Sequence, residues 1–176
     1  MDIQVAAQLI QAAVRQEHAT WADLGAGTGT FTQALQNLLP EGKIYAVDKS
    51  PHALWRLPNH PNVPMEIVDA DFTKPLDLPP LDGVLMANAL HYADKPVPLL
   101  KELLKLLKPE GIFVLVEYET HRPRPPWIPY PIPFDAFVEI AAKVGLTKPA
   151  KIGEVPSLYG RDHIYAAKCQ WIPSVG

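Results

Sequence analysis

The stretch DLGAGTGTF, residues 23–31, carries glycine at three alternate positions, Gly25, Gly27 and Gly29, directly behind a short apolar run. Glycine has no Cβ and adopts positive φ without strain, so a ligand can lie against the backbone of such a loop. The alternative is a strand-to-helix turn without a ligand, for which a single glycine is enough. The spacing therefore predicts that this loop binds a ligand through its backbone.

The offset of the glycines indicates which ligands do not fit. The dinucleotide fingerprint G-x-G-x-x-G/A requires a small residue where this chain has Thr30, and the third glycine comes one residue early. A P-loop requires a lysine, and this loop contains none. The loop is therefore not typical of sites for NAD, FAD or nucleoside triphosphates.

Two alternating periodicities indicate the elements that position this loop. Buried-type apolar runs predict strands at residues 20–24, 43–47, 65–68, 82–87, 112–116 and 163–167. Apolar residues at helical spacing predict helices at residues 3–14, 31–39, 53–57, 97–107 and 134–144. Strands that alternate with helices imply βαβ units. We therefore expect an α/β fold, a doubly wound and mainly parallel sheet with helices on both faces.

Length and composition are typical of one globular domain over residues 1–176. The net charge of −3 does not favour nucleic acid as a partner. Cys169 is the only cysteine, which excludes an intrachain disulfide and a cysteine-cluster metal site, and we expect no bound metal. The chain has no apolar run of about 18 residues and no signal-peptide pattern. We therefore expect a cytoplasmic protein with no membrane partner.

Residues 23–29 resemble motif I of the class I S-adenosylmethionine-dependent methyltransferases, and the order of the later motifs is similar to that family over about residues 20–168. Residues 88–92 resemble motif IV of its small-molecule members, and residues 107–112 resemble its structural turn before the fifth strand. The resemblance implies a Rossmann-like sheet of seven strands with an antiparallel last strand. It also implies S-adenosyl-L-methionine as the cofactor.

The resemblance assigns the cofactor contacts residue by residue. Asp48, which follows the second predicted strand, would bind both ribose hydroxyls, because a carboxylate accepts two hydrogen bonds. Asp71 would bind the adenine amino group and Phe72 would cover the adenine face, with Asp69 as a competitor for Asp71. The other cofactor-binding residues that we predict are Asp23, Gly25, Ala26, Gly27, Thr28, Gly29, Lys49, Asn88 and Ala89.

The implied chemistry is in-line displacement at a sulfonium methyl group, in which the protein orients the nucleophile and accepts its proton. We predict His91, Tyr92 and Glu117 as catalytic residues, with His91 as the base because an unperturbed imidazole has a pKa near about 6.5. A cavity wall or a hydrogen-bonding cap is the alternative role for His91. Glu117 and Glu119 share one side of an extended segment, where they either face the site or are solvated.

A proline-rich loop, residues 120–133, follows the fifth predicted strand, where this family commonly places substrate-binding insertions. Its prolines stiffen the backbone, its aromatic residues could form an apolar wall, and Arg122 and Arg124 could hold a carboxylate or phosphate. A rigid connection over the sheet edge is the alternative. The predicted substrate-binding residues are Glu119, His121, Arg122, Trp127 and Tyr130.

The sequence as a whole favours methyl transfer to a small-molecule acceptor. An Asn-Pro-Pro-Tyr motif, which resemblance would connect with methylation of amides and exocyclic amines, is absent, since Ala89 follows Asn88. Two alternatives stay open. One is a methyltransferase that acts on protein or RNA, and the other is a non-catalytic protein that binds S-adenosylmethionine and regulates a partner.

Overall fold

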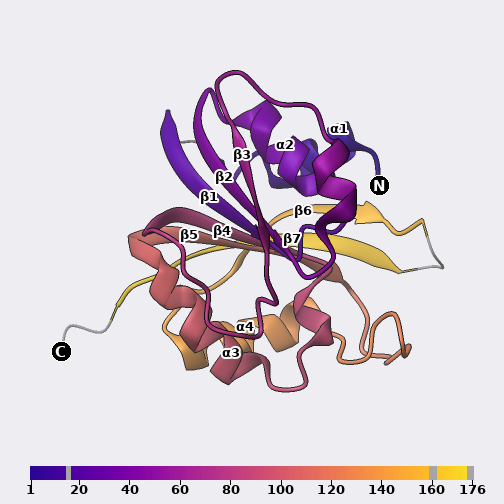
Figure 1. Cartoon of the computed structure of the whole chain (residues 1–176). Coiled ribbons are helices and arrows are strands. Elements are labelled where there is room, and N and C mark those ends of the chain that lie inside the picture. Colours follow the sequence, from indigo (N-terminus) through magenta and orange to yellow (C-terminus); the bar gives the residue numbers. More distant parts are fainter. Residues whose placement is uncertain (15–16, 159–161, 174–176) are drawn as a thin grey trace.

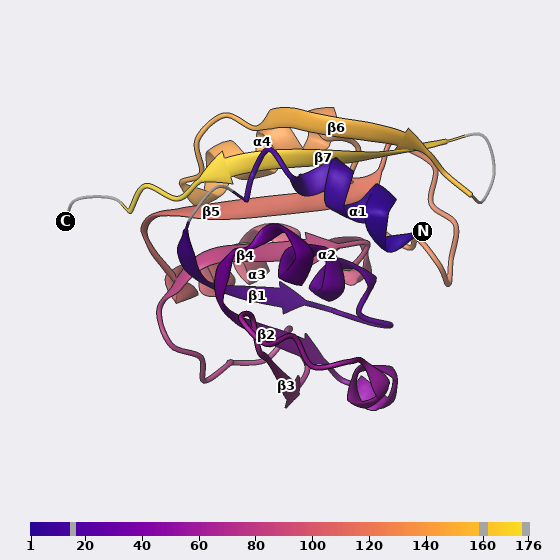
Figure 2. The same ribbon diagram turned by 90° about the horizontal axis from the view of Figure 1, so that it is seen from above.

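A sheet of seven strands, in the order β3-β2-β1-β4-β5-β7-β6, forms the centre of the molecule (Figure 2). The computed structural model describes residues 1–14, 17–158 and 162–173. The strands are β1 (His18–Leu24), β2 (Glu41–Asp48), β3 (Met65–Asp69), β4 (Leu81–Ala87), β5 (Leu107–Tyr118), β6 (Ala150–Pro156) and β7 (His163–Gln170).

The strand directions confirm the predicted mainly parallel sheet with an antiparallel last strand. β1 pairs in parallel with both β2 and β4, and β4 pairs in parallel with β5. β7 lies antiparallel between β5 and β6. The strand order reverses between β1 and β4, and open α/β sheets bind ligands beyond the carboxyl ends of the strands at such a point.

Helices cover both faces of the sheet (Figure 1). α1 (Ile3–Ile10) and α2 (Thr30–Leu38) lie on one face, and α3 (Pro96–Leu103) and α4 (Phe134–Val144) lie on the other. Three short 3-10 helices, η1 (Pro51–Arg56), η2 (Leu90–Tyr92) and η3 (Leu104–Leu106), complete the order. In the described part of the chain, no helix has the length and apolar character needed to cross a membrane.

Each face of the sheet has its own apolar core. On the α1/α2 face, Trp21 of β1 packs with Leu9, Leu35 and Ile44, and all four side chains are buried. On the α3/α4 face, apolar residues of β1, β4 and β5 pack against Phe137 and its neighbours. The middle strands are therefore buried on both sides, which explains their nearly continuous apolar sequences.

The structure corrects several predicted boundaries. β6 was not located from the sequence, and the first helix ends at Ile10 rather than at residue 14. The helix predicted at residues 97–107 ends at Leu103, and β5 begins at Leu107 because that residue pairs with Leu81. The register between β4 and β5 then shifts, so the turn expected at residues 107–112 is an irregularity inside β5.

Gly83 tests the packing of β1 against β4. A Cβ at this position would lie 2.4 Å from Cδ2 and Cε2 of Trp21, whose side chain is fully buried. We expect Gly83→Ala to lower the free energy of unfolding by about 1–3 kcal/mol, because it overpacks the core. Urea unfolding measures this change. In a Trp21→Val background the new methyl group has space, so an equal loss there would contradict the explanation.

Candidate active site

A cavity of about 670 Å³ lies at the carboxyl edge of the sheet, where the loops after β1, β2, β3 and β4 meet. Its volume is within the usual range for small-molecule and cofactor sites. Ten of the twelve predicted cofactor-binding residues line it: Gly25, Ala26, Gly27, Thr28, Asp48, Lys49, Asp71, Phe72, Asn88 and Ala89. Asp23 and Gly29 are not part of this lining.

The glycine loop is held close to β2 and has the backbone conformation that only glycine adopts easily. The N–H groups of Gly25 and Ala26 both donate to the carbonyl oxygen of Val47. Gly25 has φ 79°, and a Cβ there would lie 2.7 Å from the Cβ of Ala89 and 3.3 Å from the Phe72 ring. A side chain at this position would therefore collide with the cavity wall.

Gly29 lies outside the lining of this cavity, at the start of α2. It precedes α2 with φ 80°, and a Cβ there would lie 2.3 Å from Leu57 Cδ1 and 3.0 Å from Leu54 Cδ2. It therefore allows η1 and the residue after it to pack on the start of α2. This packing, together with the positive φ, explains why position 29 is a glycine.

Asp48 joins the end of β2 to the glycine loop. Its Oδ2 accepts a hydrogen bond of 2.7 Å from the Gly27 N–H, and its Oδ1 accepts one of 2.8 Å from the Ser50 N–H. Each carboxylate oxygen has two acceptor positions, so each retains one for an outside donor. A fixed carboxylate with two free acceptor positions at the cavity wall fits the two ribose hydroxyls of S-adenosylmethionine.

Asp71 lines the same cavity as the glycine loop. Its Oδ1 accepts hydrogen bonds from the Thr73 N–H at 2.9 Å and the Thr73 hydroxyl at 2.7 Å, and these bonds lower the pKa of the carboxyl group. Phe72 follows it and also lines the cavity, whereas Asp69 at the end of β3 does not. The arrangement fits a polar contact and an aromatic contact to the adenine.

Asp23 lies beneath the loop and is 1% exposed. Its Oδ2 accepts a 2.7 Å hydrogen bond from the Thr32 hydroxyl, and Oδ1 has no hydrogen-bond partner within residues 1–14, 17–158 and 162–173. Burial, with a smaller contribution from the Asp48 charge, raises the pKa of Asp23 from 3.8 to about 7. Its ionisation is therefore coupled to the electrostatics of the cofactor cavity.

A second cavity of about 490 Å³ adjoins the first. The two share Asn88 and Tyr92, which form the passage between them. The remaining wall is mainly aromatic and apolar, with His91, Tyr118, Arg124, Trp127 and Ile128. A ligand in this second cavity would meet the cofactor at Asn88 and Tyr92, so we name it the acceptor cavity.

His91 and Glu117 form a buried pair at one wall of the acceptor cavity. The side chains are 2% and 0% exposed, and His91 Nδ1 lies 2.7 Å from Glu117 Oε2. The backbone N–H of His91 donates to Glu117 Oε1 at 3.1 Å, so both carboxylate oxygens are engaged. His91 Nε2 has no hydrogen-bond partner among the described residues. The imidazole therefore has one nitrogen that is held and one that is unpaired.

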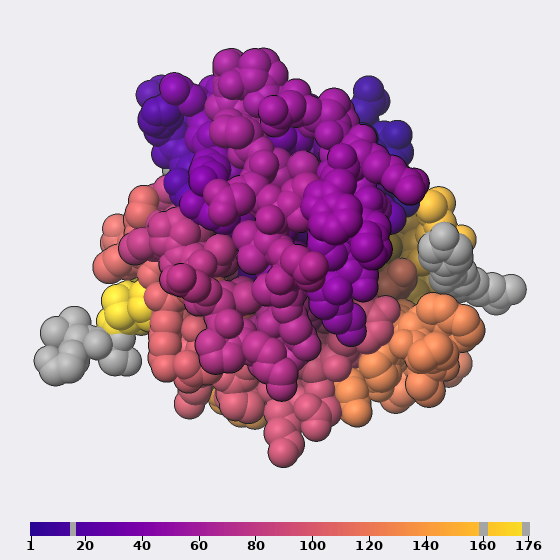
Figure 3. All heavy atoms as spheres, in the orientation of Figure 1, coloured from indigo at the N-terminus to yellow at the C-terminus, as the bar shows by residue number. Residues whose placement is uncertain are grey.

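The proline-rich loop closes over the acceptor cavity and forms a lobe on the surface, in orange (Figure 3). The Tyr130 N–H donates to the His91 carbonyl oxygen at 3.0 Å. Paired bonds between Arg124 and Ile128 close a tight turn that carries Trp127, whose side chain is 73% exposed. Arg124 forms an ion pair with Asp162, so its charge is already compensated.

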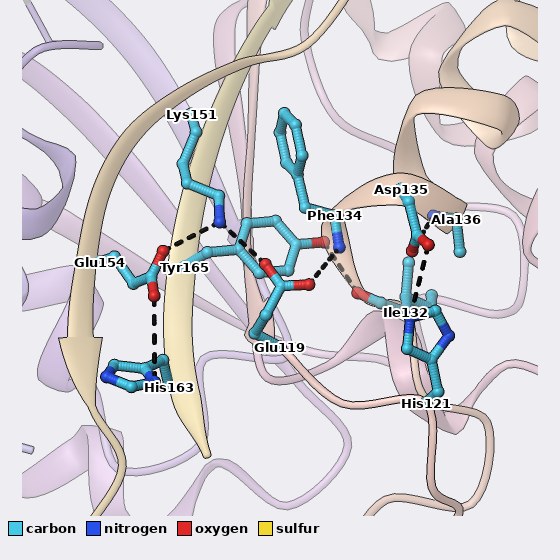
Figure 4. A network of polar contacts seen from close by, with 10 residues as sticks. All are labelled: Glu119, His121, Ile132, Phe134, Asp135, Ala136, Lys151, Glu154, His163 and Tyr165. Carbon is cyan, nitrogen blue, oxygen red and sulfur yellow. Dashed lines mark hydrogen bonds and ion pairs between the residues drawn. The ribbon is translucent and has the colours of Figure 1, made fainter.

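The other predicted acceptor residues lie outside the lining of this cavity. Glu119 accepts hydrogen bonds from the Phe134 N–H at 3.0 Å and from Lys151 Nζ at 2.9 Å, in the network at the start of α4 (Figure 4). His121 Nε2 lies 3.4 Å from an oxygen of Asp135, and both side chains are exposed. Arg122 and the Tyr130 ring are likewise not part of the lining.

Tyr118 and Ile128 are wall residues that we did not predict. Strand alternation places Tyr118 on the opposite side from Glu117. It nevertheless contributes to the cavity because it is the last residue of β5, and its ring centroid is 6.1 Å from that of His91. A position at a strand's carboxyl end was the available signal for Tyr118, whereas Ile128 gave no signal apart from its place in the loop.

Comparison with known proteins identifies the family. A family model described as a methyltransferase domain matches residues 22–113, which is more than half of the chain. The carboxy-S-adenosyl-L-methionine synthase of Ectopseudomonas mendocina is 32% identical over 115 residues, which cover 58% of this chain and 46% of that protein. The malonyl-(acyl-carrier protein) O-methyltransferase of Hahella chejuensis is 33% identical over 91 residues, which cover 51% of this chain and 33% of that protein.

Among solved structures, the 1,6-didemethyltoxoflavin N1-methyltransferase of Burkholderia thailandensis, with bound S-adenosylhomocysteine, has the same fold. The TM-score is 0.75 at 19% identity, and the match covers 97% of this chain and 78% of that one. The chain belongs to the methyltransferase domain family, and thus to the class I S-adenosylmethionine-dependent methyltransferases. The two sequence matches cover less than half of each curated relative.

Asp23 gives the protein a specific dependence of stability on pH. Its pKa is about 7 when folded and 3.8 ordinarily, so the native state holds the proton more tightly than the unfolded state. The contribution of Asp23 to the free energy of unfolding is therefore largest below pH 3.8. It decreases as the pH rises from 3.8 to about 7, by a total of up to about 4 kcal/mol. Asparagine does not ionise, so Asp23→Asn does not lose this free energy. We therefore expect the free energy of unfolding of the variant, relative to that of the wild type, to increase from pH 3.8 to about 7 and to stay constant above that.

Urea unfolding of the wild type and of Asp23→Asn between pH 4 and 8 measures the difference in their free energies of unfolding. The contributions of the other titrating groups cancel in this difference. Asp77→Asn is the matched control, since Asp77 is exposed and outside both cavities. Parallel pH profiles for the wild type and Asp23→Asn would contradict the raised pKa.

Proposed function

We propose that the chain transfers a methyl group from S-adenosylmethionine to an O–H or N–H group of a small molecule, with His91 as the general base. One observation carries this proposal: the unpaired Nε2 of the buried His91, at a cavity that adjoins the cofactor cavity. The proposal takes the tautomer in which Nδ1 donates to the Glu117 carboxylate, which leaves the lone pair of the imidazole at the buried Nε2.

The tautomer determines which acceptors fit. A lone pair at Nε2 accepts a hydrogen bond, so the group facing it is a donor that still carries its proton. The nucleophile loses this proton to Nε2, and the imidazolium that forms is stabilised by the buried carboxylate of Glu117. Acceptors without an N–H or O–H group at the reacting atom do not satisfy this arrangement.

One cavity would bind the cofactor, and the other would bind the acceptor. S-adenosylmethionine, when bound, supplies an electrophilic methyl group on a sulfonium. Asp48 and Asp71 would hold its polar groups and Phe72 its adenine, while Tyr92 and Asn88 lie at the passage. The mainly apolar wall of the acceptor cavity, with Tyr118 and Ile128, excludes water and orients the acceptor.

One structural neighbour supports a small-molecule acceptor. The protein from Burkholderia thailandensis is named for methylation of N1 of 1,6-didemethyltoxoflavin, a small molecule that is bound in its structure. The curated relative from Hahella chejuensis is named as a malonyl-(acyl-carrier protein) O-methyltransferase, so its name supports transfer to oxygen but places the acceptor on a carrier protein.

Cofactor binding is tested by thermal unfolding with S-adenosylmethionine, S-adenosylhomocysteine, NAD or ATP added separately. A ligand at about 100 times its Kd stabilises the fold by about 2.7 kcal/mol, and we expect this with the first two only. Asp48→Ala removes hydrogen bonds to a charged acceptor and is expected to weaken S-adenosylhomocysteine binding by roughly 10- to 100-fold. Asp77→Ala is the control, and stabilisation by NAD alone would refute the assignment.

Catalysis is tested with phenol, aniline and imidazole as protic acceptors, with methylated product measured by mass spectrometry. His91→Ala is expected to lower kcat by roughly 10²- to 10⁴-fold, the usual contribution of a general base. Glu117→Gln has only one acceptor oxygen for the two His91 donors, so it disturbs the tautomer of the imidazole. We expect it to lower kcat clearly, but by less than His91→Ala does.

Glu139→Gln, on the exposed side of α4, is the matched control and is expected to retain wild-type kcat. Binding of S-adenosylhomocysteine should be unchanged in all three variants. Full activity in His91→Ala would exclude His91 as the base, and no turnover of any acceptor by the wild type would count against catalysis.

A further inference from the structure

A third cavity, of about 340 Å³, adjoins the acceptor cavity. The two share Asn88 and Tyr118, so Tyr118 stands as a partition between them. The third cavity lies between the first turn of α1, the end of β6 and the start of β7, with Val5, Val155 and Ile164 in its lining. Asn88 lines all three cavities and is the point from which each can be reached.

The wall of the third cavity is mainly apolar. Apart from Asn88 and Tyr118, its lining consists of Met1, Val5, Val155, Pro156, Leu158 and Ile164, together with Asp2. Asp2 caps α1, where its carboxylate accepts a hydrogen bond from the Gln4 N–H. Leu158 is 74% exposed, which is unusual for a large apolar side chain in a concave surface. Concave apolar surface of this kind is typical of a binding site for an apolar ligand group.

The position of this cavity relative to His91 indicates what occupies it. A small protic acceptor fills only the acceptor cavity. A longer acceptor, whose reacting group faces His91 and Asn88, would extend past Tyr118, which lines both cavities. Beyond Tyr118 the wall is apolar except for Asn88 and Asp2, and the Asp2 carboxylate accepts the hydrogen bond that caps α1.

We propose that the third cavity is a subsite for an apolar chain, and that the acceptor is an amphiphile with a protic head group at His91 and an alkyl or similar chain against Val5, Val155 and Leu158. This inference rests on the proposed function, because it takes His91 as the position of the reacting group. It assigns to the acceptor a chemical class, a compound with an O–H or N–H head group and an apolar chain, for which alkylphenols are suitable probes.

A series of 4-alkylphenols tests the inference. Phenol and its 4-ethyl, 4-butyl and 4-hexyl derivatives are titrated by calorimetry into the wild-type protein saturated with S-adenosylhomocysteine. Each buried methylene should strengthen binding by about threefold to fourfold until the chain fills the cavity. An affinity that does not depend on chain length would overturn the proposal.

Variants show where the chain lies. Val5→Trp fills the cavity from α1 and is expected to abolish the gain with chain length while phenol still binds. Val138→Trp is the matched control, since Val138 is also a half-buried helix residue but lines none of the cavities described here. Leu158→Ala, at an exposed side chain, should weaken 4-hexylphenol about threefold without affecting phenol.

The outcomes separate the two proposals. If Val5→Trp keeps the full gain with chain length, the chain binds elsewhere and the subsite is refuted. The same holds if Val138→Trp and Val5→Trp lose the gain equally. If S-adenosylhomocysteine does not bind the wild type, the proposed function fails. If it binds and phenol is methylated but longer phenols gain nothing, only the subsite fails.

Discussion

The buried carboxylate of Glu117 is the constraint on which the acceptor side of the molecule depends. A charge with 0% exposure is stable only when hydrogen bonds compensate for its lost hydration. His91 provides them through its backbone N–H and its ring Nδ1, and so the turn after β4 is fixed to the end of β5. The His91 carbonyl accepts from the Tyr130 N–H, which extends the same constraint to the proline-rich loop. One buried pair thus sets the positions of the imidazole, the strand end and the loop over the cavity.

Asn88 lies at the point where the sheet topology brings the cofactor cavity and the acceptor cavity together. It is the first residue after β4, and its N–H donates to the Val116 carbonyl oxygen. Its φ is 51°, a conformation that asparagine tolerates better than most residues. The strand order reverses next to β4, so the cofactor cavity forms on the β1/β2 side and the acceptor cavity on the β4/β5 side. The two can meet only at the end of β4. The strand order alone therefore determines that the two cavities meet at Asn88.

Local sequence patterns predicted the strands that are buried on both faces and also the edge strand β3, but they missed β6 at the other edge. β1, β4 and β5 have nearly continuous apolar runs, which made them visible in the sequence. β6 is an edge strand whose residues are all exposed or half-buried, so it has no such run. The early start of β5 was also hidden, because it results from the pairing of Leu107 with Leu81, which are distant in the sequence.

The same distinction explains which site residues could be predicted. The cofactor residues lie within short loops directly after strands, so motif spacing fixes their place. Glu117 and Glu119 were predicted to share one side of an extended segment, and both carboxylates lie close to Tyr165, which pairs with Glu117. The Glu119 N–H still donates to the His163 carbonyl oxygen, but the Glu119 carboxylate is bound by Lys151 and the Phe134 N–H, outside the acceptor cavity. Strand alternation therefore predicts the side on which a carboxylate lies, whereas its partners depend on α4 and β6, which are distant in the sequence.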